Sequence, residues 1–236
     1  MNAKYLLAST LKHIGLFELT RSAMIKLGLH VPVPHGHALL INALNEKAEL
    51  EGGKLFGYVC IEIGSTREDL PGQSSTLALA EKCNELGVHF ITVDMDPSNT
   101  ASAIETVKRI NPAFEAINAK GEDYLAGYTG RLDFLYLDAF DIDHSHHSER
   151  RRERYKEILN SDINDEACHA MHLDCASAAV KLMSEQSDIV FDDAWRSENG
   201  WAGKGTTAMP LLLSKGFEVK RETKNTVHLR RKAIEP

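Results

Sequence analysis

The sequence predicts an α/β protein with a doubly wound, mostly parallel sheet of seven strands. Short apolar runs alternate with segments of helical periodicity along most of the chain. The first of these runs, Tyr58–Ile63, is followed by Gly64, as is typical of a buried parallel strand. The last two runs, Phe217–Arg221 and Thr226–Arg230, are joined by a short turn at Lys224–Asn225, which predicts a terminal antiparallel pair.

Length and composition limit the classes of function. The chain has 236 residues, of which 43% are hydrophobic, which suits one large domain with a packed core. The formal net charge of −7 argues against broad nucleic-acid binding. We find no signal-peptide pattern, no run of the roughly 20 apolar residues that a membrane span needs, and too few cysteines for a disulfide framework. We therefore expect a cytoplasmic protein that binds a small molecule, with a homodimer as one option for its assembly.

The N-terminal part, residues 1–50, is expected to be a helical cap, followed by a sheet domain over residues 51–236. Apolar residues recur at helical spacing in three stretches, the last of which is His37–Leu50. The VPVPHGH stretch before it contains two prolines, which forbid helix and favour an extended turn. The cap either covers a pocket or forms a packing layer against the sheet.

The elements of the sheet domain follow in order. A helix is expected at Ser75–Leu86, where Gly87 ends it, and a second strand at His89–Asp94. Ser98 or Asn99 is expected to cap the next helix, which continues to Ile110. The later elements are a strand at Phe114–Ala119, a short helix around Tyr124, a strand at Leu132–Leu137, a strand at Ile189–Phe191 and a helix around Leu211–Leu213.

The interval between the fourth and fifth strands, residues 139–188, is unusually long. A compact crossover needs far fewer residues. We therefore expect this enlarged crossover to be a substrate-binding or dimer-forming elaboration at the carboxyl edge of the sheet.

Acidic residues stand near the ends of nearly all the strands. They are Glu62, Asp94, Glu122, Asp138 and the pair Asp192 and Asp193. A lone acid of this kind is often a helix cap or a solvated loop residue, but packing does not require an acid at so many strand ends. Because open α/β sheets bind ligands at the carboxyl ends of their strands, the set predicts a ligand site at that edge.

Asp94 ends the second strand, where dinucleotide folds place the acid that binds ribose hydroxyls. The glycine-rich fingerprint that exposes the backbone to a pyrophosphate is absent, because Gly64 is followed by Ser65-Thr66-Arg67. An acid for a ribose without a pyrophosphate cradle indicates a nucleoside cofactor. It argues against the alternative of a nicotinamide-dependent oxidoreductase.

Four features together resemble the class I S-adenosylmethionine-dependent methyltransferases over roughly residues 57–232: Glu62-x-Gly64, Asp94, Gly121-Glu122 and the fourth-strand sequence LDFLYLDAF. In that family the loop after the first strand wraps the methionine end of the cofactor, the acid of the second strand binds the ribose, and the residues after the third strand flank the adenine. The resemblance implies a Rossmann-like fold and a methyltransferase that binds S-adenosylmethionine.

The same resemblance implies a set of cofactor contacts: Glu62, Gly64, Ser65, Asp94, Gly121, Glu122 and Asp138. The tight glycine motif of the family is replaced here by an inserted loop between Gly64 and the next helix. We expect Ser74 and Ser75, at the N-terminus of that helix, to face the carboxylate of the cofactor, because the helix dipole favours an anion there.

Asp138, Asp192 and Asp193 predict a divalent cation. The fourth and fifth strands should be neighbours, so these carboxylates converge and repel one another unless a cation lies between them. Ligands that are all oxygen suit Mg²⁺. The FDDAW sequence resembles the acid pair that holds Mg²⁺ in cation-dependent O-methyltransferases of the catechol and macrocin-like types. The alternative is that Asp192 and Asp193 merely cap the next turn.

The leading hypothesis is therefore a Mg²⁺-assisted O-methyltransferase that acts on a small hydroxylated metabolite. The metal would lower the pKa of the acceptor hydroxyl. Asp138, His144 and His147 are the candidate catalytic residues, although the histidines also fit a solvated loop. Two alternatives stay open: a related enzyme that methylates nitrogen or carbon or uses the cofactor otherwise, with structural acids, and a non-enzymatic cofactor-binding protein.

Overall fold

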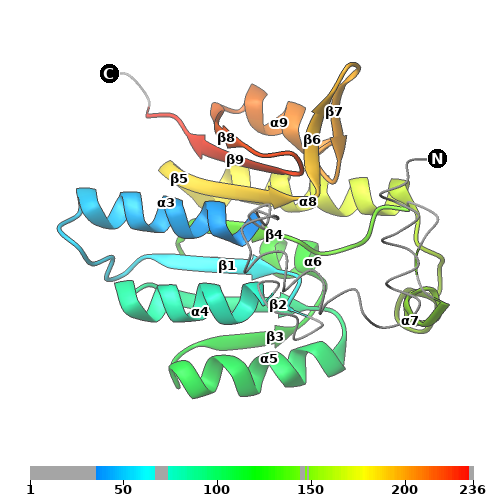
Figure 1. The fold of residues 1–236 in the computed structure, drawn as a ribbon, viewed down its shortest axis with the longest axis horizontal. Coiled ribbons are helices and arrows are strands. Elements are labelled where there is room, and N and C mark those ends of the chain that lie inside the picture. The colour runs from blue at the N-terminus through cyan, green and yellow to red at the C-terminus, as the bar shows by residue number, and fades with distance from the viewer. Residues whose placement is uncertain (1–35, 67–73, 144–146, 148, 234–236) are drawn as a thin grey trace, which may run out of the picture. The chain divides into compact units, whose positions relative to one another are not determined.

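The structure, a computed structural model, describes residues 36–66, 74–143, 147 and 149–233, apart from the side chain of Arg150 (Figure 1). These residues belong to one unit, His35–Pro236. Most of the predicted N-terminal cap, residues 1–35, and the candidate base His144 lie outside the described residues. None of the described helices combines the length and the apolar character that crossing a membrane requires.

A seven-stranded sheet forms the centre of the unit, which confirms the predicted fold class. Its strand order is β3-β2-β1-β4-β5-β9-β8. The strands are β1 (Val59–Ile63), β2 (His89–Asp94), β3 (Glu115–Asn118), β4 (Leu132–Leu137), β5 (Met183–Asp192), β8 (Phe217–Glu222) and β9 (Thr226–Arg231). The last strand, β9, is antiparallel to both of its neighbours, whereas β1 to β5 pair in parallel. The order reverses at β1, which lies between β2 and β4.

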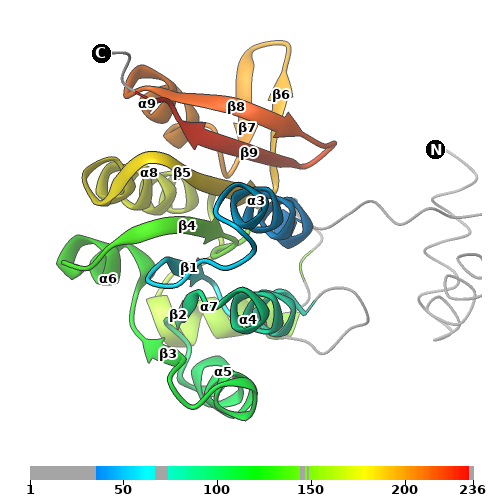
Figure 2. The ribbon, with the colours of Figure 1, turned by 90° about the vertical axis from the view of Figure 1, so that its left-hand side faces the viewer.

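Helices cover both faces of the sheet, so the unit has three layers (Figure 2). One face carries α3 (Gly36–Leu50), α4 (Ser75–Leu86) and α5 (Pro97–Ile110). The other face carries α6 (Gly121–Gly127), α8 (Asp165–Leu182) and α9 (Ala208–Ser214). The remaining helix, α7 (Glu149–Leu159), lies beyond the carboxyl ends of the parallel strands (Figure 1).

Helix α3 forms a packing layer on the sheet. Its side chains Leu39, Leu40 and Leu44 are buried in the core that also holds residues of α4 and β4. The third stretch of the predicted cap therefore packs against the sheet, which is one of the two roles that the sequence left open for the cap.

Several boundaries differ from the prediction. Strand β5 begins at Met183, well before the predicted Ile189, and the N-cap of α5 is Asp96, whose carboxylate accepts a hydrogen bond from the Ser98 N–H at 2.7 Å. The expected cap residues, Ser98 and Asn99, lie inside the helix. A hairpin of β6 (Ala194–Ser197) and β7 (Gly200–Gly203), which follows β5, was not predicted.

Two glycines allow the chain to cross closely at the carboxyl edge of the sheet. Gly64 has φ +97°, and a Cβ atom built on it would lie 2.7 Å from the Ala139 backbone nitrogen. A Cβ atom on Gly121 would lie 2.1 Å from Cγ2 of Ile63. The ends of β1 and β4 and the start of α6 are therefore packed so tightly that side chains at these two positions do not fit.

Candidate functional site

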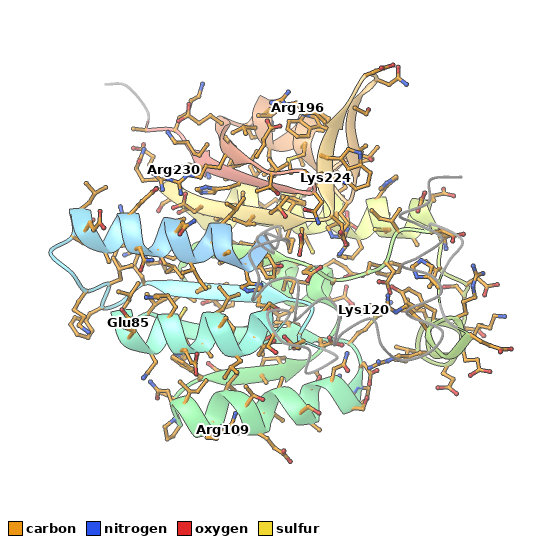
Figure 3. All side chains as sticks on the ribbon, viewed as in Figure 1. Glu85, Arg109, Lys120, Arg196, Lys224 and Arg230 are labelled. Carbon is orange, nitrogen blue, oxygen red and sulfur yellow. The ribbon has the colours of Figure 1, made fainter. Side chains whose placement is uncertain are left out.

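A pocket lies at the carboxyl ends of β1, β2, β3 and β4, next to the reversal of strand order. Gly64, Asp94, Gly121 and Glu122 line it, and these are four of the predicted cofactor contacts. Lys120, labelled in Figure 3, lies on the same wall. The pKa of Glu122 is raised by partial burial, which makes its proton easier to retain than in water. The structure thus brings these four predicted contacts, which span 58 positions from Gly64 to Glu122 (122 − 64), together in one cavity.

The carboxylate of Asp94 is fixed on this wall by N–H donors. Oδ2 accepts hydrogen bonds from the Ser65 backbone N–H at 3.0 Å and from Asn99 Nδ2 at 3.2 Å, and Oδ1 accepts one from the Asp96 N–H at 2.8 Å. The hydroxyl of Ser65 bonds to that of Thr92 at 2.8 Å. Ser65 therefore holds the acid in place from behind the pocket wall.

Glu62 is fully buried behind the pocket, where three hydroxyl groups donate to it. Ser75 donates to Oε1 at 2.7 Å, while Thr76 and Thr92 donate to Oε2 at 2.7 Å and 2.6 Å. Burial raises the pKa of Glu62 to about 7, against the lowering effect of these hydrogen bonds. Neither Glu62 nor Ser75 is among the described residues on the pocket wall, so direct cofactor contact by their side chains, or by Ser74, stays a prediction.

The raised pKa of Glu62 makes the stability of the fold depend on pH. The native state holds this proton more tightly than the unfolded chain does, so the contribution of Glu62 to stability is fully present below pH 4.5 and is lost as pH rises from 4.5 to about 7. The loss from this group is about 3 kcal/mol over that interval, as an order of magnitude. Urea unfolding of Glu62→Gln at pH 5.5 and pH 8 should therefore show a flatter pH dependence than the unsubstituted chain.

The control for this experiment is Glu105→Gln, at an exposed position of α5. Its pH dependence should follow that of the unsubstituted chain. A pH dependence of Glu62→Gln that also follows the unsubstituted chain would contradict the assignment of this titration to Glu62.

Helix α7 closes one side of the pocket and is anchored at both of the surrounding loops. Arg154 forms an ion pair with Asp96 and donates a hydrogen bond to Asn99 Oδ1 at 2.6 Å. The hydroxyl of Tyr155 accepts a hydrogen bond from the Asp141 N–H at 2.6 Å, and its ring packs edge-on against Phe140. This part of the enlarged crossover therefore contributes to the pocket; its expected role in dimer formation stays a prediction.

The three acids at the ends of β4 and β5 lie together, as predicted, but a lysine lies between two of them. Lys204 Nζ is 2.8 Å from Asp138 Oδ1 and 3.3 Å from Asp193 Oδ2. Only 2% of the Lys204 side chain is exposed. Burial lowers the pKa of its ammonium group, but Asp138 and Asp193 raise it by more, so the pKa is raised overall and Lys204 carries its charge.

Asp192 is compensated separately. Its Oδ2 accepts a hydrogen bond from the Tyr136 hydroxyl at 2.9 Å, and its Oδ1 accepts one from the Thr226 hydroxyl at 2.9 Å. The N-terminus of α3 lies against the same carboxylate, because a Cβ atom on Gly36 would be 2.9 Å from Asp192 Cγ. The positive end of the helix dipole is thus directed at this acid.

The predicted magnesium site does not fit this arrangement. Among the residues that the structure describes, no group of three or more histidine, cysteine, aspartate or glutamate side chains is placed to hold a metal ion. The ammonium group of Lys204 bridges Asp138 and Asp193, and the oxygens of Asp192 are engaged with hydroxyl donors. A divalent cation would have to displace the lysine from its place between the two carboxylates.

The candidate base His147 lies in the loop between β4 and α7. Its Nε2 is 2.7 Å from the Ile142 carbonyl oxygen, so that nitrogen carries the hydrogen and donates it. A catalytic role for His147 stays a prediction.

Sequence reasoning missed the residues that complete the two halves of the site. Lys204 lies in a Gly-Lys-Gly stretch that is typical of a surface loop, so no pattern indicated its burial. Arg154 and Tyr155 belong to a basic, strongly polar segment that usually faces solvent. The unusual length of residues 139–188 is the signal that could have pointed to Arg154 and Tyr155.

Neither the comparison with protein-family models nor the comparison with curated proteins finds a match for this sequence. Solved structures do match. NSun6 from Pyrococcus horikoshii, solved with SFG, aligns with TM-score 0.53 and 12% identity over 89% of this chain and 55% of its own. CalS11, a TDP-rhamnose 3′-O-methyltransferase in calicheamicin biosynthesis, aligns with TM-score 0.50 and 12% identity over 82% and 76% of the two chains.

A TehB-like S-adenosylmethionine-dependent methyltransferase from Corynebacterium glutamicum matches more of this chain, 94%, and 99% of its own, at TM-score 0.44 and 11% identity. At 12% identity, the similarities to NSun6 and CalS11 show the fold alone. The Rossmann-like arrangement found in S-adenosylmethionine-dependent methyltransferases is therefore the arrangement of the described chain.

Proposed function

We propose that this chain is an S-adenosylmethionine-dependent methyltransferase that methylates a hydroxyl group of a small molecule. One observation carries the proposal: the pocket that contains Asp94 and the cluster of Asp138, Asp193 and Lys204 adjoin at the end of β4. Ala139 lines the pocket, and the preceding residue, Asp138, belongs to the cluster. A cofactor and an acceptor would thus meet at the end of β4.

The cofactor half of the site is formed by residues from three strand ends. Asp94 lines the pocket and is held by backbone N–H groups, so it would accept a hydrogen bond from the ribose, and Gly121 and Glu122 would form the wall that flanks the adenine. Gly64 also lines this wall, and its lack of a side chain lets the end of β1 pack against the backbone of Asp138 and Ala139. When bound, S-adenosylmethionine supplies an electrophilic methyl group on a sulfonium centre.

The acceptor half is formed by Asp138 and Asp193. Their side chains are 32% and 52% exposed, so both can accept a hydrogen bond from an acceptor hydroxyl while Lys204 stays behind them. A carboxylate that accepts the hydroxyl proton increases the electron density on the attacking oxygen. The protein's main contribution would be to hold the acceptor oxygen in line with the methyl group.

The carboxylates favour oxygen as the methylated atom, since an acceptor amine would be held by them in its unreactive, protonated form. Metal assistance was part of the sequence-based hypothesis, but the placement of Lys204 does not support it, so the proposal is made without it. Catalysis by N- or C-methylation, and binding of the cofactor without turnover, are outcomes that the following test can reveal.

Calorimetric titration of S-adenosylhomocysteine into the full chain tests the proposal. We expect one binding site per chain, with the same dissociation constant in EDTA and in magnesium chloride. Absence of binding in both solutions would overturn the cofactor assignment. Binding only with magnesium would restore the metal-dependent hypothesis. Methyl transfer to an amine or a carbon acceptor but to no hydroxylated one would favour the N- or C-methylating alternative. Binding without methyl transfer to any of these acceptors would favour a non-enzymatic role.

A further inference from the structure

The position of Lys204 has a structural cause in the β6–β7 hairpin. The chain leaves β5 at Asp192, passes through the hairpin and returns, so that the Lys204 N–H donates to the Asp193 carbonyl oxygen at 2.9 Å. Gly203 has φ +69°, and a Cβ atom on it would lie 2.1 Å from that same oxygen. The hairpin thus fixes the lysine backbone against the second acid of the pair.

The ammonium group then occupies the space where the acids converge. It contacts Asp138 from β4 and Asp193 from the end of β5, and it is almost completely enclosed. Like-charged carboxylates that lie close together repel one another, and a cation between them removes that cost. The chain supplies that cation from its own sequence, at the place where oxygen ligands would otherwise collect a divalent ion.

We infer that the Lys204 ammonium group takes the place of a divalent cation at the ends of β4 and β5, as a positioning residue that orients Asp138 and Asp193 toward the acceptor. The identity of the acceptor as a hydroxyl group rests on the proposed function. The role of Lys204 as the cation does not depend on it. Because the lysine is enclosed, it does not bind the acceptor itself. Recognition falls to the two carboxylates, which need one hydroxyl donor and not the pair of adjacent oxygens that a chelating metal requires.

The inference predicts a gain of metal binding when the lysine is removed. Lys204→Ala leaves the two acids without a compensating charge and with space between them. Mn²⁺ should therefore bind this variant at least about tenfold more tightly than it binds the unsubstituted chain, and it should raise the melting temperature of the variant. Lys204→Arg, which keeps the charge, and Lys215→Ala, which removes an exposed lysine, should bind Mn²⁺ no better than the unsubstituted chain. Adding Asp193→Asn to Lys204→Ala should abolish the gain.

Calorimetry with Mn²⁺ and thermal unfolding with Mn²⁺ or EDTA would measure these effects on the full chain. The inference is overturned if the unsubstituted chain binds Mn²⁺ and loses that binding in Asp193→Asn, or if folded Lys204→Ala gains nothing. Should Lys204→Ala fold only when Mn²⁺ is present, that rescue would support the inference. Should Lys204→Ala not fold at all, the Mn²⁺ titrations of the unsubstituted chain and of Asp193→Asn decide: binding that Asp193→Asn loses overturns the inference, and absence of binding by the unsubstituted chain supports it.

Titration of S-adenosylhomocysteine into the same samples separates the two proposals. A gain of Mn²⁺ binding in Lys204→Ala together with no cofactor binding by any sample would overturn the proposed function and leave the role of Lys204 standing. Cofactor binding by the unsubstituted chain without a gain of Mn²⁺ binding in folded Lys204→Ala would overturn the role of Lys204 and leave the cofactor assignment standing.

Discussion

Asp94→Asn is expected to weaken S-adenosylhomocysteine binding by about 100-fold, a loss of about 2.7 kcal/mol. The two oxygens of Asp94 accept from different donors, Ser65 N–H on one and Asp96 N–H on the other. An asparagine in either orientation therefore turns its NH₂ group toward one of these N–H groups. An unsatisfied buried donor costs about 1–3 kcal/mol, so either the loop at the end of β1 or the N-terminus of α5 should shift at the same time as the ribose acceptor is lost.

A second buried acid provides the matched control. Asp133 is 3% exposed and accepts a hydrogen bond from the Val59 N–H at 3.0 Å, but it lies at the start of β4, at the opposite edge of the sheet from the pocket. Asp133→Asn should lower stability and leave the affinity unchanged. Calorimetric affinity together with urea unfolding separates the two effects. Equal affinity losses in both variants would mean that general destabilisation, and not the position of Asp94, explains the result.

Gly64→Ala is expected to destabilise the fold by about 3 kcal/mol, from a left-handed backbone conformation that costs an L-residue about 1–2 kcal/mol and a steric conflict of similar size. Its new methyl group would meet the Ala139 nitrogen at 2.7 Å and the Asp138 carbonyl carbon at 2.8 Å. These are backbone atoms at the end of β4, so they cannot rotate away from the methyl group as a side chain would. The melting temperature should fall by roughly 6–12 °C.

Gly127→Ala is the control for this substitution. Gly127 ends α6, a Cβ atom there would meet no other atom within 4 Å, and its φ does not favour glycine. Differential scanning calorimetry should show little change or a small gain for Gly127→Ala. A melting temperature of Gly64→Ala that also stays unchanged would show that the ends of β1 and β4 are less closely packed than described.

The elements that the sequence predicts well are those whose signals are local. Strands β2 and β4 and helix α4 begin and end where the prediction placed them, because each is a compact apolar run or a periodic segment with a clear stop such as Gly87. The start of β5 was missed because polar residues precede its apolar part, and pairing with β4 extends it. Tertiary pairing overrides local preference there.

The β6–β7 hairpin had a local signal that was not used. Asn199-Gly200 stands between Trp195 and Trp201 in the sequence, and an Asn-Gly dipeptide is a frequent signal of a hairpin. In the structure the two turn residues are Glu198 and Asn199, and Gly200 is the first residue of β7. The burial of Lys204 had no such signal, since it depends on the hairpin returning to Asp193. The acids of the site could thus be predicted from strand ends, but the group that neutralises them could not.

The strand order described above also constrains how the chain can fold as it is synthesised. Strand β1 pairs on one side with β2, which follows closely, and on the other with β4, where the Val59 N–H bonds to the Asp133 side chain at a separation of 74 residues. At roughly 5–20 residues per second, a ribosome would need several seconds to add that length. During that time one hydrogen-bonding side of a strand that is almost entirely buried in the finished fold has no partner. Aggregation during expression should therefore depend more on the delay between β1 and β4 than on the stability of the finished fold.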